Sequence, residues 1–171
     1  MPNAKLLLVD PQNDFCDLPG AALPVNGANA DLQRVAGLLR AAGHRFDDVI
    51  VTLDSHPSVA IERTSFWETG EGGAVAPFTA VSAEAVRAGR VRPRSGTATV
   101  DEVLAYLDAL EGGGRYRLTV WPVHCVIGTW GHALHAELAD ALTAWELAHG
   151  RNALKVLKGQ HPLTEQYSAL R

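Results

Sequence analysis

Three short, mainly apolar runs constrain the fold of this chain most, and each is followed at once by a charged side chain. Apolar runs of this kind are typical of strands that are buried on both faces of a parallel sheet. Ligands of open parallel sheets bind beyond the carboxyl ends of the strands, so we expect the charged residues to gather at one edge. The runs and the residues that follow them are 6–9 with Asp10, 49–53 with Asp54, and 153–157 with Lys158.

Helical periodicity fills much of the chain between these runs. Apolar residues recur every three or four positions over 32–39, 100–110 and 134–145, which predicts amphipathic helices, the last of them over 131–148. A fourth strand is predicted at 117–121. The order strand, helix, strand implies parallel pairing through a crossover. The fold class we predict is α/β, with a three-layer, Rossmann-like arrangement in which helices flank a mostly parallel sheet.

The segment 58–96 differs from the rest of the chain. It mixes Gly, Pro, Trp and charged residues without a clear period, which predicts a long loop insertion with at most short elements. The sequence contains no internal repeat and no low-complexity tract that would mark a boundary. We therefore expect residues 1–171 to form a single domain.

Composition excludes several classes of protein. The net charge is −4 and the basic residues are scattered, whereas nucleic-acid binding needs clustered positive charge. No apolar run approaches the roughly 20 residues of a membrane span, and the N-terminus does not look like a secretory signal. We expect a cytoplasmic protein with no nucleic-acid or membrane partner. Its two cysteines, Cys16 and Cys125, are expected to be thiols.

A metal site is predicted from one short motif and one distant histidine. In the segment Asp54-Ser55-His56, a carboxylate and an imidazole lie two residues apart and so point to the same side of an extended chain. His124 is the best candidate for a third ligand, because the neighbouring Pro122 and Gly128 suggest an irregular loop. One carboxylate and two imidazoles with open positions for water suit Zn²⁺, with Fe²⁺ or Mn²⁺ as alternatives.

Four blocks carry a wider resemblance: LLLVDPQNDFC at 6–16, TLDSHP at 52–57, WPVHCVIGTWG at 121–131 and KGQHPLTEQYSAL at 158–170. In this order they resemble the nicotinamidase-like cysteine hydrolases, which have the isochorismatase-like hydrolase fold. The resemblance implies hydrolysis of a small amide, as in nicotinamide to nicotinate plus ammonia. It also implies that Asp10 is the general acid/base, that Lys158 keeps a thiolate charged, and that Asp54, His56 and His124 bind the metal.

The sequence departs from this family in two places. Many relatives have a further His shortly before a Ser-Phe pair, where this chain has Arg63-Thr64, so we expect water at any fourth coordination position. The nucleophilic cysteine of the family lies beyond the segment that aligns here, so the C-terminal part of the fold is predicted to be missing. Cys16 and Cys125 are interpreted as packing groups. Phe15 is the preferred aromatic wall for a substrate.

Three functions remain open from the sequence. The first is a metal-assisted cysteine amidase, and the second is a non-catalytic metal-binding or assembly module of the same fold. The third is an isochorismatase-like hydrolase, although that branch generally lacks both metal-binding blocks. The strand at 153–157 is expected to lack a neighbour on one side, which predicts a homo-oligomer or association with a chain that completes the sheet.

Overall fold

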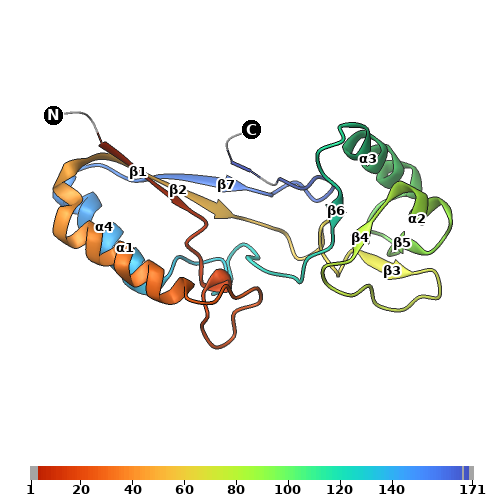
Figure 1. Ribbon diagram of the computed structural model, residues 1–171, viewed down its shortest axis with the longest axis horizontal. Helices are drawn as coiled ribbons and strands as arrows, with labels where there is room; N and C mark the ends of the chain where they lie inside the picture. The colour runs from red at the N-terminus through yellow and green to blue at the C-terminus, as the bar shows by residue number, and fades with distance from the viewer. Residues whose placement is uncertain (1–3, 167, 170–171) are drawn as a thin grey trace. The chain divides into compact units, whose positions relative to one another are not determined.

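The fold is described from a computed structural model, which places residues 4–166 and 168–169. These residues form two compact units (Figure 1). The first unit contains residues 4–55, 124–158 and 168–169, and the second contains residues 56–123 and 159–166. No helix in the described part of the chain is both long enough and apolar enough to cross a membrane.

A three-stranded parallel sheet forms the centre of the first unit (Figure 1). β2 lies in the middle and pairs with β1 on one side and β7 on the other. The register places Val9 opposite Thr52, and it places Asp54 opposite Lys158. The carboxyl ends of the three strands therefore lie at the same edge. The strands are β1 (Ala4–Val9), β2 (Phe46–Asp54) and β7 (Leu154–Lys158).

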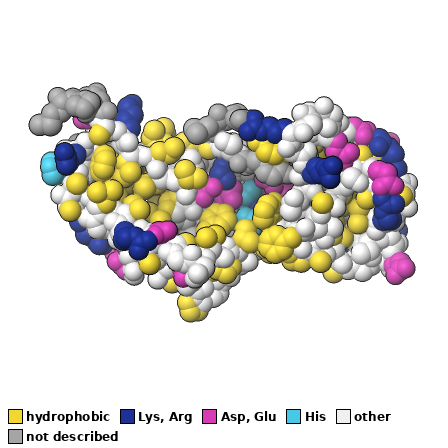
Figure 2. All heavy atoms as spheres, viewed as in Figure 1, with side chains coloured by type: hydrophobic (Ala, Val, Ile, Leu, Met, Phe, Trp, Pro, Cys, Tyr) yellow, Lys and Arg dark blue, Asp and Glu magenta, His cyan; other side chains and the backbone are white. Residues whose placement is uncertain are grey.

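Helices α1 (Ala28–Ala42) and α4 (Ala136–His149) pack on each other and on one face of this sheet. Their apolar stripes meet strand residues such as Leu8 and Val51, which form one core with Leu142 and Trp145. Because successive strand residues point to opposite faces, the residues between these core positions face away from the helices. Among them Leu7 is 42%, Val9 65% and Leu154 59% exposed, and Figure 2 shows hydrophobic side chains, in yellow, gathered over these strands.

The second unit is built from short elements around its own core. Strands β3 and β5 form one antiparallel pair, and β4 and β6 form another. Thr99 is the N-cap residue of the longer helix: its hydroxyl accepts from Glu102 N, and its backbone amide donates to the Glu102 carboxylate, which forms a capping box. The elements are β3 (Trp67–Thr69), β4 (Ala80–Val81), α2 (Ala83–Arg87), β5 (Val91–Pro93), α3 (Val100–Gly112) and β6 (Leu118–Thr119).

The α/β class, with a parallel sheet and flanking helices, is confirmed. Two elements differ from their predicted form. The strand predicted at 117–121 shrinks to Leu118–Thr119 and pairs antiparallel with β4, because its partner comes from the aperiodic segment 58–96. The helix predicted from residue 131 begins only at Ala136, because residues 131–135 instead bond to the loop after β1, with Asn13 N donating to Ala133 O at 3.0 Å.

The last strand along the chain, β7, agrees with its prediction. β7 pairs with β2 alone among the residues that the structure places, so one of its edges has no strand beside it. The segment 58–96 carries only short strands and one short helix, as its lack of period indicates. Two 3₁₀ turns, η1 (Asn13–Phe15) and η2 (Gly43–Arg45), complete the described elements.

Candidate functional site

Lys158 lies between two carboxylates at the carboxyl edge of the sheet. Its Nζ is 3.0 Å from Asp10 Oδ2 and is in closer contact with Asp54 Oδ1. Burial by itself lowers the pKa of Lys158, but the carboxylates of Asp54 and Asp10 outweigh burial and raise the pKa above its ordinary value. The group is therefore a fixed ammonium ion at neutral pH. The structure brings together the three charged residues that the strand ends predicted.

Asp10 is held in a conformation that aims its carboxylate at this ammonium. It is the first residue after β1 and has a φ of +48°, in the left-handed region that non-glycine residues seldom adopt. Its backbone amide donates to Thr52 O at 3.1 Å, and the Thr52 hydroxyl donates to Asp10 Oδ1 at 2.6 Å. One carboxylate oxygen thus faces Thr52 on the neighbouring strand, and the other faces Lys158.

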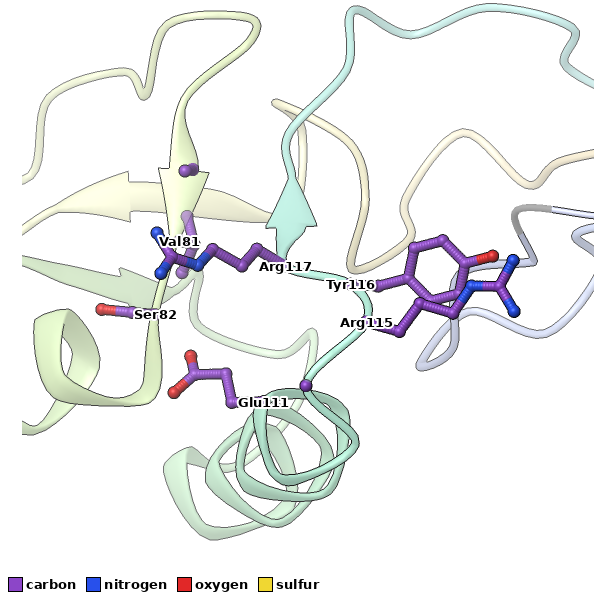
Figure 3. A pocket seen from close by; sticks show the side chains of 8 residues that line it. Val81, Ser82, Glu111, Arg115, Tyr116 and Arg117 are labelled. Atoms are coloured by element: carbon purple, nitrogen blue, oxygen red, sulfur yellow. The ribbon is translucent and has the colours of Figure 1, made fainter.

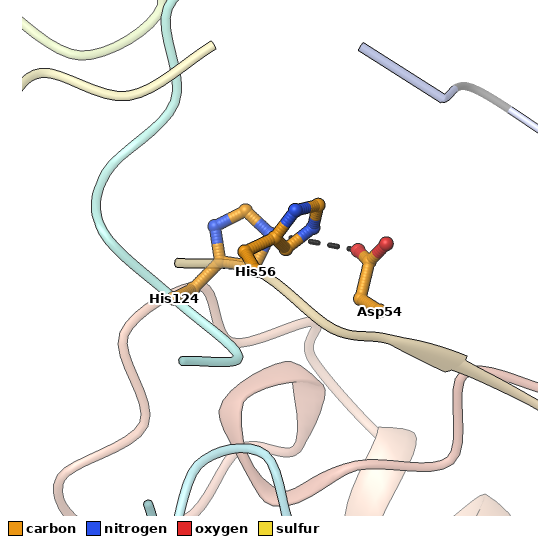
Figure 4. Close-up of side chains that lie close together, drawn as sticks. All are labelled: Asp54, His56 and His124. Atoms are coloured by element: carbon orange, nitrogen blue, oxygen red, sulfur yellow. Dashed lines mark ion pairs between the residues drawn. The ribbon is translucent and has the colours of Figure 1, made fainter. Parts of the chain in front are cut away.

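Asp54, His56 and His124 form the candidate metal centre (Figure 4). One potential ligand atom of each residue lies within 4.8 Å of the other two, and His124 Nε2 is 3.6 Å from Asp54 Oδ2. Ligand atoms about 2.1 Å from a tetrahedral zinc ion are about 3.4 Å apart, close to the 3.6 Å between His124 Nε2 and Asp54 Oδ2. His56 is 1% and His124 5% exposed. The donor set therefore fits the predicted divalent metal.

Gln12 fixes the backbone of Asp54, a role that no pattern in the sequence predicts. Its side-chain amide donates to Asp54 O at 2.7 Å and to His132 O at 3.0 Å, while its Oε1 accepts from Asp54 N at 2.7 Å. The side chain is fully buried, and buried polar groups keep such partners because losing them is costly. Gln12 therefore ties the loop after β1 to Asp54, the first candidate metal-binding residue.

The loop that carries His124 is fastened to the same segment by Asp14. Asp14 Oδ2 accepts from Cys125 N at 2.6 Å, and Cys125 has a φ of +48°. A Cβ atom at Gly131 would lie 2.0 Å from the same oxygen, so only glycine fits there. Asn13 adds a bond from Nδ2 to Trp130 O at 2.8 Å. The polar residues after β1 thus determine where His124 lies.

Phe15 lies beside His124, a candidate metal-binding residue, and lines a cavity. Its ring meets the His124 ring edge to face, with centroids 5.3 Å apart. The cavity, of about 320 Å³, is bounded by the end of β1, the following loop and the start of α1. Its volume lies at the lower end of the range for small-molecule pockets. The lining residues are mostly apolar and include Val9, Asp10, Phe15, Cys16, Val25 and Leu32.

Neither cysteine has the surroundings of a nucleophile. Both are fully buried, and each thiol contacts a backbone carbonyl: Cys16 Sγ is 3.3 Å from Gln12 O, and Cys125 Sγ is 4.0 Å from Gly131 O. Burial, followed by the nearby charge of Asp17, raises the pKa of the Cys16 thiol. A raised pKa lowers the thiolate fraction on which reactivity depends. These contacts agree with the interpretation of both cysteines as packing groups.

Two histidines near the start of α4 make specific contacts. His132 Nε2 is 2.9 Å from Ser55 Oγ, and this hydroxyl donates its proton to Leu53 O at 3.1 Å. The Ser55 hydroxyl thus connects the His132 ring to the end of β2. His135 is the N-cap residue of α4, and its Nε2 lies 2.8 Å from Asn29 Oδ1.

A larger cavity of about 670 Å³ lies within the second unit (Figure 3). Its lining includes Glu111, Arg115 and Arg117, together with the ends of short elements. Glu111 Oε1 accepts from the Ala83 amide at 2.8 Å at the start of α2, so this carboxylate has a structural role. None of the residues predicted to be catalytic or to bind metal lines this cavity. Cavity size therefore does not identify the candidate site.

Comparison with known proteins connects this arrangement to one group of hydrolases, although no family model matches the sequence. The chain is 30% identical to a nicotinamidase of Escherichia coli (strain K12) over 169 residues, which are 99% of this chain and 57% of that protein. It is 27% identical to a nicotinamidase of Saccharomyces cerevisiae over 135 residues, which are 79% of this chain and 50% of that protein. The chain spans about half the length of these relatives.

Solved structures show the same fold. The yeast nicotinamidase Pnc1p matches with a TM-score of 0.64 at 24% identity, over 96% of this chain and 61% of that one. An Acinetobacter baumanii nicotinamidase/pyrazinamidase matches with a TM-score of 0.60 at 23% identity, over 98% and 56% of the two chains. A pyrazinamidase of Pyrococcus horikoshii in complex with zinc matches with a TM-score of 0.51 at 20% identity, over 97% and 57%.

Proposed function

We propose that this chain provides the acid, the ammonium group and the metal site of a metal-assisted cysteine hydrolase of small amides. The chain is a homologue of the nicotinamidases and pyrazinamidases and covers roughly half of their length. One observation carries the proposal. Lys158 Nζ lies 3.0 Å from Asp10 Oδ2 and in contact with Asp54 Oδ1, and the other oxygen of Asp54 faces His124 Nε2 at 3.6 Å. The acid, the cation and the metal ligands thus form one continuous polar cluster.

Each group in the cluster has a role in amide hydrolysis by a thiol. Asp10 accepts the thiol proton, and the Lys158 ammonium stabilises the resulting thiolate. The thiolate attacks the amide carbon, the carbon–nitrogen bond breaks, and Asp10 returns the proton to the departing ammonia. Water then cleaves the thioester, with Asp10 as the base, and releases the carboxylic acid and the thiolate. When bound, a divalent ion would supply Lewis acidity toward the substrate or water.

The surroundings of Asp10 and Phe15 favour a small aromatic amide such as nicotinamide as the substrate. The cavity of about 320 Å³ that both residues line is mostly apolar, and a flat heteroaromatic ring gains from contact with the Phe15 ring. Zinc is the metal that we propose, because one carboxylate and two imidazoles are typical zinc ligands. The zinc-containing pyrazinamidase of Pyrococcus horikoshii supports this choice.

A second candidate function is a metal-binding or assembly module without turnover. It is favoured by the full burial of Cys16 and Cys125 and the raised pKa of the Cys16 thiol. Among the described residues, no strand lies beside one edge of β7. In both candidate functions, the backbone groups of this edge are open to pairing with another strand. We propose association with a second chain there, and sedimentation as a monomer would contradict it.

Ammonia release from nicotinamide tests the amidase against the module. The protein is expressed from its complete reading frame, stripped of metal and reloaded with zinc. The amidase predicts ammonia release that is lost without metal and falls at least about 100-fold in Asp10→Asn, as expected for loss of a general acid/base. The control is Asp48→Asn, which removes an exposed carboxylate paired with Lys5 and should leave the rate unchanged. Bound zinc without ammonia release would overturn the amidase in favour of the module.

A further inference from the structure

We infer that Glu62 and Gly159 are positioning residues that orient His56, so that its Nε2 faces the metal; the inference rests on the proposed metal site. His56 Nδ1 lies 2.9 Å from Gly159 O and 3.2 Å from Glu62 Oε1. All three residues belong to the second unit. Two acceptor oxygens therefore face the same ring nitrogen.

These two contacts determine which nitrogen of His56 can bind an ion. An acceptor oxygen attracts a ring N–H and repels a ring lone pair, so Nδ1 must carry the proton of the neutral imidazole. The lone pair then lies on Nε2, on the opposite side of the ring. Metal-binding histidines commonly donate their other N–H to a carboxylate or a backbone carbonyl, which fixes the tautomer and makes the ligand more basic. His56 has both kinds of acceptor.

Gly159 allows this close approach because it has no side chain. A Cβ atom at residue 159 would lie 2.2 Å from His56 Cε1 and 2.5 Å from Nδ1, far inside contact distance. Its φ of +81° also lies in the left-handed region of the backbone, which favours glycine. Residue 159 follows Lys158 directly in the chain. The Lys-Gly pair at the end of β7 therefore places a charged side chain and then a backbone support for a metal-binding residue.

Burying the charge of Glu62 costs folding free energy, which suggests that this residue is kept for its function. It forms a fully buried ion pair with Arg63, whose Nε is 3.3 Å from Glu62 Oε1, and each side chain is only 1% exposed. Neither Glu62 oxygen has a well-directed hydrogen bond within the part of the chain that the structure describes. Buried ion pairs of this kind often stabilise a fold no better than apolar residues would. The position of this carboxylate beside His56 is explained if it orients the His56 ring for metal binding.

The first test removes the charge of Glu62 while keeping its shape. Zinc affinity of Glu62→Gln, measured by competition with a chromophoric chelator, should fall about 10- to 100-fold, as for other partners of metal-binding histidines. Glu68→Gln is the matched control, because Glu68 also pairs with an arginine, Arg92, at 2.6 Å. Cobalt-substituted Glu62→Gln should keep the visible spectrum of the cobalt-loaded wild type. An unchanged affinity, or a changed coordination spectrum that makes Glu62 itself a ligand, would overturn the inference.

The second test separates steric displacement from backbone strain at Gly159. Gly159→Ala should lose zinc affinity by at least the same factor, because its Cβ would displace the His56 ring. Gly72→Ala is the control, since Gly72 has a φ of +85° with nothing within 4 Å of a Cβ atom. Equal losses in both variants would show that strain alone is responsible and would overturn the role of Gly159.

A measurement without metal keeps this inference separate from the proposed function. Nitrogen chemical shifts of the His56 ring in the metal-free wild type should show the Nδ1–H tautomer, and this population should decrease in Glu62→Gln. The Nε2–H tautomer in the wild type would overturn the inference even if zinc binds. Conversely, a wild type with the Nδ1–H tautomer that binds no zinc would refute the proposed metal site and leave the orientation of His56 by Glu62 and Gly159 intact.

Discussion

Replacement of Gln12 by methionine should destabilise the protein by about 3–5 kcal/mol. The side chain is fully buried and makes three hydrogen bonds to the backbone, two with Asp54 at 2.7 Å each and one with His132 O at 3.0 Å. Methionine has a similar volume, so the loss comes from hydrogen bonds and not from a cavity. Each bond contributes about 1 kcal/mol net, and each buried group left without a partner adds a penalty. The sum is a large part of the roughly 5–15 kcal/mol that stabilises a typical domain.

Urea unfolding followed by fluorescence and circular dichroism measures this change as a shift of the midpoint at constant slope. Gln33→Met is the matched control. Gln33 makes one exposed hydrogen bond, from Nε2 to Glu137 Oε1 at 2.8 Å, and its loss should change stability by less than about 0.5 kcal/mol. A destabilisation of less than about 1 kcal/mol in Gln12→Met would contradict this prediction and would indicate that water replaces the lost partners without cost.

Two further predictions concern titratable side chains. Cys16 and Cys125, both free and buried, should resist iodoacetamide in the native protein at pH 8 and react fully in urea; labelling of the native protein, read by mass spectrometry, would contradict this. Hydrogen bonds from Asn29 N and then Gly27 N lower the pKa of Asp17. Its contribution to stability is therefore complete above the unfolded pKa of about 3.9 and is lost as pH falls through the lower folded pKa. Asp17→Asn should lose less stability than the wild type between pH 5 and pH 3 in urea titrations, and equal losses would count against the role of these bonds.

The sequence predicted the parallel sheet and the charged edge because both depend on local patterns. Apolar runs mark β1, β2 and β7. Because these strands are parallel, the residues at their carboxyl ends necessarily lie at the same edge of the sheet. Asp10, Asp54 and Lys158 follow from this rule alone. The D-x-H spacing similarly places His56 beside Asp54. His124 is indicated by the irregular loop that Pro122 and Gly128 suggest and by the family resemblance, because nothing in its own segment shows which distant residues it approaches.

The supports of the site were not predictable, because they depend on contacts between distant residues. Gln12 is 42 positions away from Asp54, and a glutamine in a loop is ordinarily exposed to solvent. Charged side chains are ordinarily exposed, yet Glu62 and Arg63 are each only 1% exposed. The short β6 strand was misjudged for the same reason, since its partner β4 lies in a segment without periodicity. The local sequence thus predicted the reactive groups, whereas only the structure shows which residues hold them in place.

The proposed function depends most on the ability of Asp54, His56 and His124 to hold one divalent ion. An anomalous difference map recorded at the zinc absorption edge, from crystals grown with zinc, tests this directly. One peak is predicted, within about 2.0–2.2 Å of a carboxylate oxygen of Asp54 and of one ring nitrogen each of His56 and His124. No peak among these three residues at saturating zinc, or a peak only at other side chains, would contradict the proposed site.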